Sequence, residues 1–203
     1  MTGAFLAEDY APESPWCPHP ERWHSTLNES GLREETEIEV SELVAAFVRG
    51  LQPDYVLETG TAKGQTTEMM AAQLKRNGFG HLYTLDMSAG RLLAVASRLE
   101  AEYKDYITYV EGASQIWEPP ADVSFDFAFI DCDFHIRPEV VNHFRPWFHP
   151  GTILALHDVG PIFAYGPIEH GCGEARLEPL IAEGYMRMAV MHNPRGLAIC
   201  EVL

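Results

Sequence analysis

The stretch LETGTAKGQTT (57–67) begins at the end of a hydrophobic run and continues into small residues, including two glycines and four threonines. Such a loop between a buried parallel strand and its helix lets a ligand approach the backbone amides at the helix start. It is not a phosphate-binding P-loop, because Lys63 is followed by Gly64 and Gln65 rather than by Ser or Thr. Gly60 and Gly64 alone are equally compatible with an ordinary turn.

Strand and helix signals alternate along the chain around this loop. A first helix is expected over 34–49, with Gly50 as its cap. The expected strands are 55–59, 81–86, 106–112, 125–131 and 152–158, and the helices between them are 65–76, 89–103 and 137–147. Because the strands are almost continuously apolar, the pattern predicts a parallel sheet covered by helices on both faces.

The last part of the chain departs from this alternation. After a short helix near 176–183, two strand signals at 185–193 and 196–203 are separated only by the turn Pro194-Arg195. A turn this short predicts an antiparallel hairpin at the end of the sheet. We therefore predict one α/β domain over 33–203, with a mostly parallel seven-stranded sheet, a C-terminal antiparallel hairpin and helices on both faces.

Residues 1–32 are rich in proline and aromatic side chains, which disfavours regular structure but supplies rings for packing. We predict an arm or lid that closes over a substrate, covers an apolar patch or forms a homodimer contact. With the Gly-rich segment 160–174, it would shape a pocket for a small-molecule acceptor.

Composition excludes several partners. The 203 residues include 14 basic and 30 acidic side chains, and the formal charge of −16 would repel a nucleic-acid backbone. No apolar run approaches the roughly 20 residues needed to cross a bilayer, and the first residues do not resemble a signal peptide. We expect a cytoplasmic protein with no nucleic-acid or membrane partner.

Acidic residues end the first two strands of the expected sheet. Glu58 and Asp86, together with Gly60 and Gly64, resemble the motifs of the class I S-adenosylmethionine-dependent methyltransferases. The resemblance covers about residues 34–203 and implies a Rossmann-like methyltransferase fold that binds S-adenosylmethionine. In that family the acid ending the second strand accepts the ribose hydroxyls, which suits a carboxylate because it can bind two donors. Gly112-Ala113-Ser114 matches the segment that seats the adenine edge. The implied cofactor residues are Glu58, Gly60, Thr61, Gly64, Asp86, Met87, Ala113, Ser114 and Asp131.

A second polar group ends two strands that should be neighbours. Asp131 and Asp133 follow one strand, and His157 and Asp158 end the other, at the edge where open α/β sheets bind ligands. Carboxylates placed side by side repel each other unless they share a cation. Oxygen ligands favour Mg²⁺, whereas a histidine ligand shifts the preference towards Mn²⁺, Fe²⁺ or Zn²⁺.

The same residues resemble the metal-dependent small-molecule O-methyltransferases, namely the catechol and caffeoyl-CoA type and the sugar and antibiotic-tailoring enzymes. This resemblance implies a divalent metal, Mg²⁺ or Mn²⁺, held by Asp131, His157 and Asp158. The chain departs from these families at Phe134, which stands where they carry a Lys or His base. The catalytic base is left open among His135, His157 and His170.

Simpler interpretations stay open. An aspartate at the position of Asp131, taken alone, is typical of a helix cap. His157 could likewise be a core histidine whose hydrogen bonds are satisfied. For the whole chain the alternatives are a nicotinamide-dependent oxidoreductase, a methyltransferase-fold tailoring protein with other chemistry such as hydroxylation, and a non-catalytic cofactor-binding subunit. The oxidoreductase would require a parallel sixth strand. The sequence favours an S-adenosylmethionine-dependent O-methyltransferase acting on a small-molecule hydroxyl.

Overall fold

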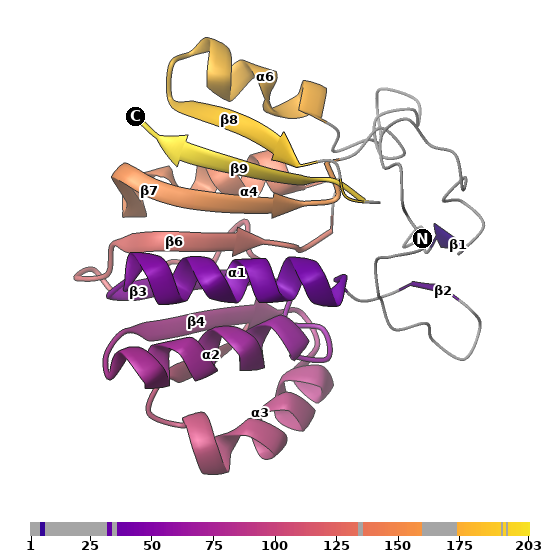
Figure 1. Ribbon diagram of the computed structural model, residues 1–203, viewed down its shortest axis with the longest axis vertical. Coiled ribbons are helices and arrows are strands. Elements are labelled where there is room, and N and C mark those ends of the chain that lie inside the picture. The colour runs from indigo at the N-terminus through magenta and orange to yellow at the C-terminus, as the bar shows by residue number, and fades with distance from the viewer. Residues whose placement is uncertain are drawn as a thin grey trace.

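The protein is represented by a computed structural model, which describes residues 5–6, 32–33, 36–133, 136–159, 174–191, 193 and 195–203. The strands of its large sheet are β3 (Tyr55–Thr59), β4 (His81–Asp86), β5 (Ile107–Glu111), β6 (Phe125–Ile130), β7 (Phe148–His157), β8 (Met186–Met191) and β9 (Leu197–Val202). They form a seven-stranded sheet in the order β5-β4-β3-β6-β7-β9-β8 (Figure 1). β9 pairs antiparallel with both β7 and β8, and the other neighbouring pairs are parallel. The predicted sheet with its C-terminal antiparallel hairpin is confirmed.

Helices cover both faces of this sheet. They are α1 (Ile38–Leu51), α2 (Gln65–Asn77), α3 (Ala89–Tyr103), α4 (Arg137–Phe144) and α6 (Glu174–Ala182). α1, α2 and α3 pack on one face, and α4 and α6 pack on the other; Figure 1 shows α1 to α3 in front and α4 behind. In the part of the chain that the structure describes, no helix has both the length and the apolar stretch that a membrane crossing requires.

The strand pleat divides the core between the two faces. Side chains alternate along a strand, so Phe127 and Phe129 of β6 pack under α1 to α3 while Ala128 and Ile130 pack under α4 and α6. All four are almost completely buried. A central strand covered on both faces is apolar where it is covered, so the polar residues of β6 lie near its ends, at Asp126 and just beyond it at Asp131.

Some predicted boundaries were wrong. α1 runs through Gly50 to Leu51, and the left-handed cap is Gln52 (φ 52°), so Gly50 is not the cap. α4 stops at Phe144, and the chain continues as the 3-10 turn η3 (Arg145–Trp147). Pro146 lacks the backbone N–H that a longer α-helix would need there.

The predicted arm is described in one short stretch. β1 (Phe5–Leu6) pairs antiparallel with β2 (Leu32–Arg33), which links the arm to the chain just before α1. The remaining residues of 1–32, and all but the last residue of segment 160–174, lie outside the described residues. The roles predicted for them stay predictions.

Candidate active site at the carboxyl edge of the sheet

The glycine loop, residues 60–64 between β3 and α2, packs tightly between strand ends. Gly60 has a φ of 93°, and a Cβ there would lie 2.4 Å from the backbone oxygen of Asp131. Its N–H donates to the carbonyl of Leu85 at 2.8 Å. Gly64 caps α2 with a φ of 76°, and a Cβ there would lie 2.4 Å from Cγ1 of Val95 on α3. Both glycines therefore serve close packing as well as an unusual backbone conformation.

Asp86 joins the end of β4 to this loop. Its Oδ2 accepts the backbone N–H of Ala62 at 3.0 Å, and its Oδ1 accepts that of Ser88 at 2.8 Å. The N–H of Gly112, which follows β5, donates to the Asp86 carbonyl at 3.1 Å. Each carboxylate oxygen can accept a second hydrogen bond, so Asp86 can still bind a ligand with two hydroxyl donors.

The other predicted cofactor residues follow neighbouring strand ends. Ser114 is buried just after β5, and the Met87 side chain beside Asp86 is 76% exposed. Burial raises the pKa of the Cys132 thiol after β6, and the nearby side chains of Thr59 on β3 and Ser114 after β5 oppose that rise. The ends of β3, β5 and β6 thus lie close together around the loop.

Glu58 lies under the loop, with only 1% of its surface exposed. Its Oε2 accepts the hydroxyls of Thr67 and Thr84, each at 2.6 Å. Burial raises the pKa of Glu58 to about 7, the two hydroxyls oppose that rise, and Asp131 and Asp86 add to it. Glu58 therefore supports the loop from inside the protein.

Glu58→Gln is expected to make stability less dependent on pH. The pKa of Glu58 rises from 4.5 to about 7 on folding, so the folded state loses stability as pH rises through this range. Above pH 7 the penalty reaches up to about 3 kcal/mol, which the neutral amide avoids. Urea unfolding should show the variant more stable than the parent at pH 8 and similar to it near pH 4. The exposed Glu100→Gln is the control, and equal stability of parent and Glu58→Gln at both pH values would contradict the prediction.

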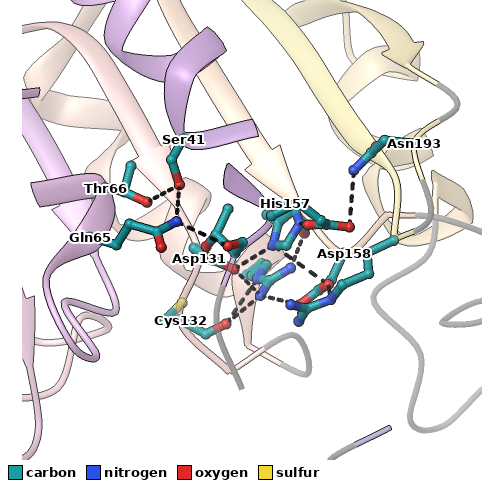
Figure 2. A network of polar contacts seen from close by, with 12 residues as sticks. Ser41, Gln65, Thr66, Asp131, Cys132, His157, Asp158 and Asn193 are labelled. Carbon is teal, nitrogen blue, oxygen red and sulfur yellow. Dashed lines mark hydrogen bonds and ion pairs between the residues drawn. The ribbon is translucent and has the colours of Figure 1, made fainter. Parts of the chain in front are cut away.

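The second predicted group converges at the ends of β6 and β7 (Figure 2). Ligand atoms of Asp131, His157 and Asp158 all lie within 4.8 Å of one another. Asp133 is exposed and does not belong to this set. Asp158 has a φ of 58°, a conformation that is strained for a residue other than glycine and often marks functional sites.

His157 is completely buried between carboxylates. Its Nε2 lies 2.7 Å from Oε2 of Glu37, and its Nδ1 lies 3.1 Å from Oδ1 of Asp131. Carboxylates only accept hydrogen bonds, so both ring nitrogens carry protons. Burial alone would lower the pKa of His157, but Asp158, Asp131 and Glu37 raise it to about 9.

Two arginines neutralise the strand-end carboxylates. Nη2 of Arg137 lies 2.9 Å from both Oδ1 of Asp131 and Oδ2 of Asp158. Arg195 places Nε 2.6 Å from Oδ1 of Asp158 and Nη2 2.8 Å from its Oδ2. Burial alone would raise the pKa of Asp158, but Arg195, His157 and Arg137 hold it well below its usual range.

The starts of α1 and α2 complete the network (Figure 2). The Thr36 hydroxyl donates to Oδ2 of Asp131 at 2.5 Å. Nε2 of Gln65 donates to the Thr36 carbonyl at 3.2 Å and to the Ser41 hydroxyl at 3.0 Å. Ser41 in turn hydrogen-bonds with Thr66 at 2.9 Å.

The described residues, as arranged, do not fit a divalent metal. Every carboxylate oxygen of Asp131 and Asp158 already faces a proton donor or a positive charge. Both nitrogens of His157 carry protons that are bonded to carboxylates, so neither offers a lone pair to a metal. The three carboxylates of Glu37, Asp131 and Asp158 are balanced by the imidazolium of His157 and the guanidinium groups of Arg137 and Arg195. A divalent ion would have to displace an arginine and would leave this buried cluster with excess charge.

Sequence reasoning missed four side chains that contact Asp131, His157 or Asp158 directly. They are Thr36, Glu37, Arg137 and Arg195. Glu37 and His157 are 120 positions apart, and no local pattern connects them. The predicted histidines His135 and His170 lie outside the described residues.

Comparison with known proteins identifies the family. Residues 57–159, more than half of the chain, match a family model described as a methyltransferase domain. The chain belongs to this methyltransferase family. The matched range contains the glycine loop, Asp86, Asp131 and the His157-Asp158 pair, and it confirms the predicted enzyme family. No curated protein sequence matches this methyltransferase.

Solved structures confirm the fold of this methyltransferase. An O-methyltransferase from Bacillus cereus in complex with S-adenosylhomocysteine is 21% identical, with a TM-score of 0.70 and coverage of 83% of each chain. The O-methyltransferase TomG from Streptomyces achromogenes, in complex with S-adenosylmethionine and involved in tomaymycin synthesis, is 20% identical with a TM-score of 0.69; the match covers 81% of this chain and 79% of TomG. An S-adenosylhomocysteine-bound methyltransferase from Podospora anserina is 16% identical with a TM-score of 0.66, covering 81% of this chain and 78% of that one. The antiparallel β9 also distinguishes this fold from the oxidoreductase alternative.

Proposed function

We propose that this methyltransferase transfers the methyl group of S-adenosylmethionine to a hydroxyl of a small molecule. The observation that carries the proposal is the contact between Asp86 and the glycine loop, with Oδ2 3.0 Å from the Ala62 N–H. This contact places a carboxylate beside backbone that a ligand can approach. The Bacillus cereus structure, which holds S-adenosylhomocysteine, and the TomG structure, which holds S-adenosylmethionine, support it because their folds are similar.

The donor would lie across the carboxyl ends of β3, β4 and β5. Asp86 would accept its ribose hydroxyls, and the exposed thioether of Met87 offers apolar surface to the adenine ring. Ala113 and Ser114 would border the adenine edge. Gly60, Thr61 and Gly64 would face the remainder of the donor, with Asp131 beside the reacting end and Glu58 holding the loop from below.

The reaction needs positioning more than activation of the donor. S-adenosylmethionine carries its own leaving group, so the protein must align the acceptor oxygen and exclude water. We assign His157 to holding Glu37 and Asp131 rather than to proton transfer, because its ring is 0% exposed and both nitrogens are already bonded. His135 and His170 stay the predicted candidates for the base.

Asp86→Asn is expected to weaken donor binding by about 1.5 to 3 kcal/mol, the range for a lost hydrogen bond to a charged group. The amide keeps the shape of the side chain and one carbonyl acceptor, so the backbone fold should survive. Calorimetric titration with S-adenosylhomocysteine measures the loss, roughly ten- to a hundredfold in Kd.

Asp122→Asn is the matched control, because Asp122 is also an aspartate but lies exposed before β6. It should bind the donor product as the parent does. Unchanged affinity in Asp86→Asn would mean that the ribose contact lies elsewhere.

A further inference from the structure

The guanidinium of Arg137 lies at the point where two carboxylates would share a cation. Its Nη2 is 2.9 Å from an oxygen of Asp131 and 2.9 Å from an oxygen of Asp158. The same nitrogen donates to the Cys132 carbonyl at 2.7 Å, and Nε donates to that carbonyl at 2.9 Å. Nη1 donates to the His157 carbonyl, and the side chain is only 2% exposed. Arg137 is therefore held by both strand ends at once.

With Arg137 in place, the positive side chains of this cluster balance its three carboxylates. Arg195 forms a two-pronged contact with Asp158, and His157 bridges Glu37 and Asp131. Each carboxylate of the cluster has at least one positive partner within 3.1 Å. Among the described residues of this cluster, additional positive charge would lack a counterion in a site from which water is largely excluded.

We propose that Arg137 is the resident cation of this strand-end cluster and that the enzyme works without a divalent metal. Arg137 ties the end of β6 to the end of β7 and to the first position of α4. The Asp131 carbonyl packs against Gly60 of the glycine loop, so Arg137 is a positioning residue for the donor side of the site. The inference deepens the proposed methyl transfer and rests on it for the nature of the reaction.

The direct test is to titrate the protein with Mn²⁺ and to measure the free ion by its electron paramagnetic resonance signal. Chelator-treated parent protein should leave the signal of added Mn²⁺ unchanged, and Mn²⁺ should not raise its melting temperature. Arg137→Gln uncovers two carboxylates, so this variant should bind one Mn²⁺ per chain and gain melting temperature from it. Arg145→Gln removes an arginine from a largely exposed ion pair with Glu183 and should behave like the parent.

Two results of the Mn²⁺ titration of the parent and Arg137→Gln would overturn the inference. One is stoichiometric Mn²⁺ binding by the parent that Asp131→Asn abolishes. The other is a folded Arg137→Gln that leaves the Mn²⁺ signal unchanged, because the arginine would then not stand in for a cation. If Arg137→Gln does not fold, Arg137→Lys retains a positive charge and should fold without binding Mn²⁺; stoichiometric binding by that variant would also contradict the inference.

Titration with S-adenosylhomocysteine separates this inference from the proposed function. The parent should bind it with the same affinity in chelator and in Mn²⁺. Binding of S-adenosylhomocysteine that requires Mn²⁺ would overturn the proposal that Arg137 takes the place of a metal, while supporting the donor site. Absence of binding in both conditions would refute the proposed donor, whereas the Mn²⁺ result would still decide the role of Arg137.

Discussion

Gly60→Ala is expected to cost about 2 to 5 kcal/mol of unfolding free energy and to abolish donor binding. The left-handed backbone at Gly60 (φ 93°) is strained for alanine by roughly 1 to 2 kcal/mol. A Cβ would also lie 2.4 Å from the backbone oxygen of Asp131, and overpacking of this kind adds about 1 to 3 kcal/mol. Neither backbone can move freely, because β3 and β6 are paired in the centre of the sheet.

Gly78→Ala separates the two contributions. Gly78 has a similar φ of 82° at the end of α2, but a Cβ there would meet no atom of the described residues within 4 Å. It should cost about 1 kcal/mol and leave donor binding intact. Urea unfolding and calorimetry of both variants test the comparison, and equal losses of stability would show that the contact with Asp131 relaxes at no cost.

Arg137→Gln is expected to destabilise the fold by about 3 to 5 kcal/mol, the usual cost of removing one partner from a buried ion pair. The change leaves Asp131 and Asp158 with less compensation in a buried cluster. Arg187→Gln, which breaks an ion pair whose arginine is 71% exposed, should change stability by less than about 1 kcal/mol. Urea unfolding at neutral pH measures both.

A double-mutant cycle sharpens this result. Arg137→Gln leaves the Asp158 carboxylate with one positive partner fewer, and Asp158→Asn removes that negative charge. The double variant should therefore be more stable than the sum of the two single losses predicts. Additive losses, or an Arg137→Gln variant as stable as the parent, would show that Arg137 does not neutralise Asp158.

The elements predicted most accurately have complete local signals. α3 has the predicted bounds, because Ser88 caps its start and Leu92, Val95 and Leu99 recur at helical spacing. β7 was predicted to begin at residue 152. In the structure it begins at Phe148, which pairs with Phe125 beside a register shift between Phe125 and Phe127. An irregularity of this kind depends on the partner strand and has no local pattern.

The site was partly predictable for a related reason. Parallel strands end at one edge, so the convergence of Asp131, His157 and Asp158 followed from the strand order. The repulsion between carboxylates also indicated a positive partner. Its identity was not readable, because Arg137 begins a helix and Arg195 lies in a hairpin turn, and neither position has a periodic signal. Charge compensation is a three-dimensional property that distant residues satisfy together.

The most direct test is calorimetric titration of the chelator-treated protein with S-adenosylhomocysteine. We expect saturable binding at one site per chain, unchanged by added Mn²⁺, weakened in Asp86→Asn and lost in Gly60→Ala. Folded parent protein that releases no heat of binding, with or without Mn²⁺, would contradict the assignment of the glycine loop and Asp86 as a methyl-donor site.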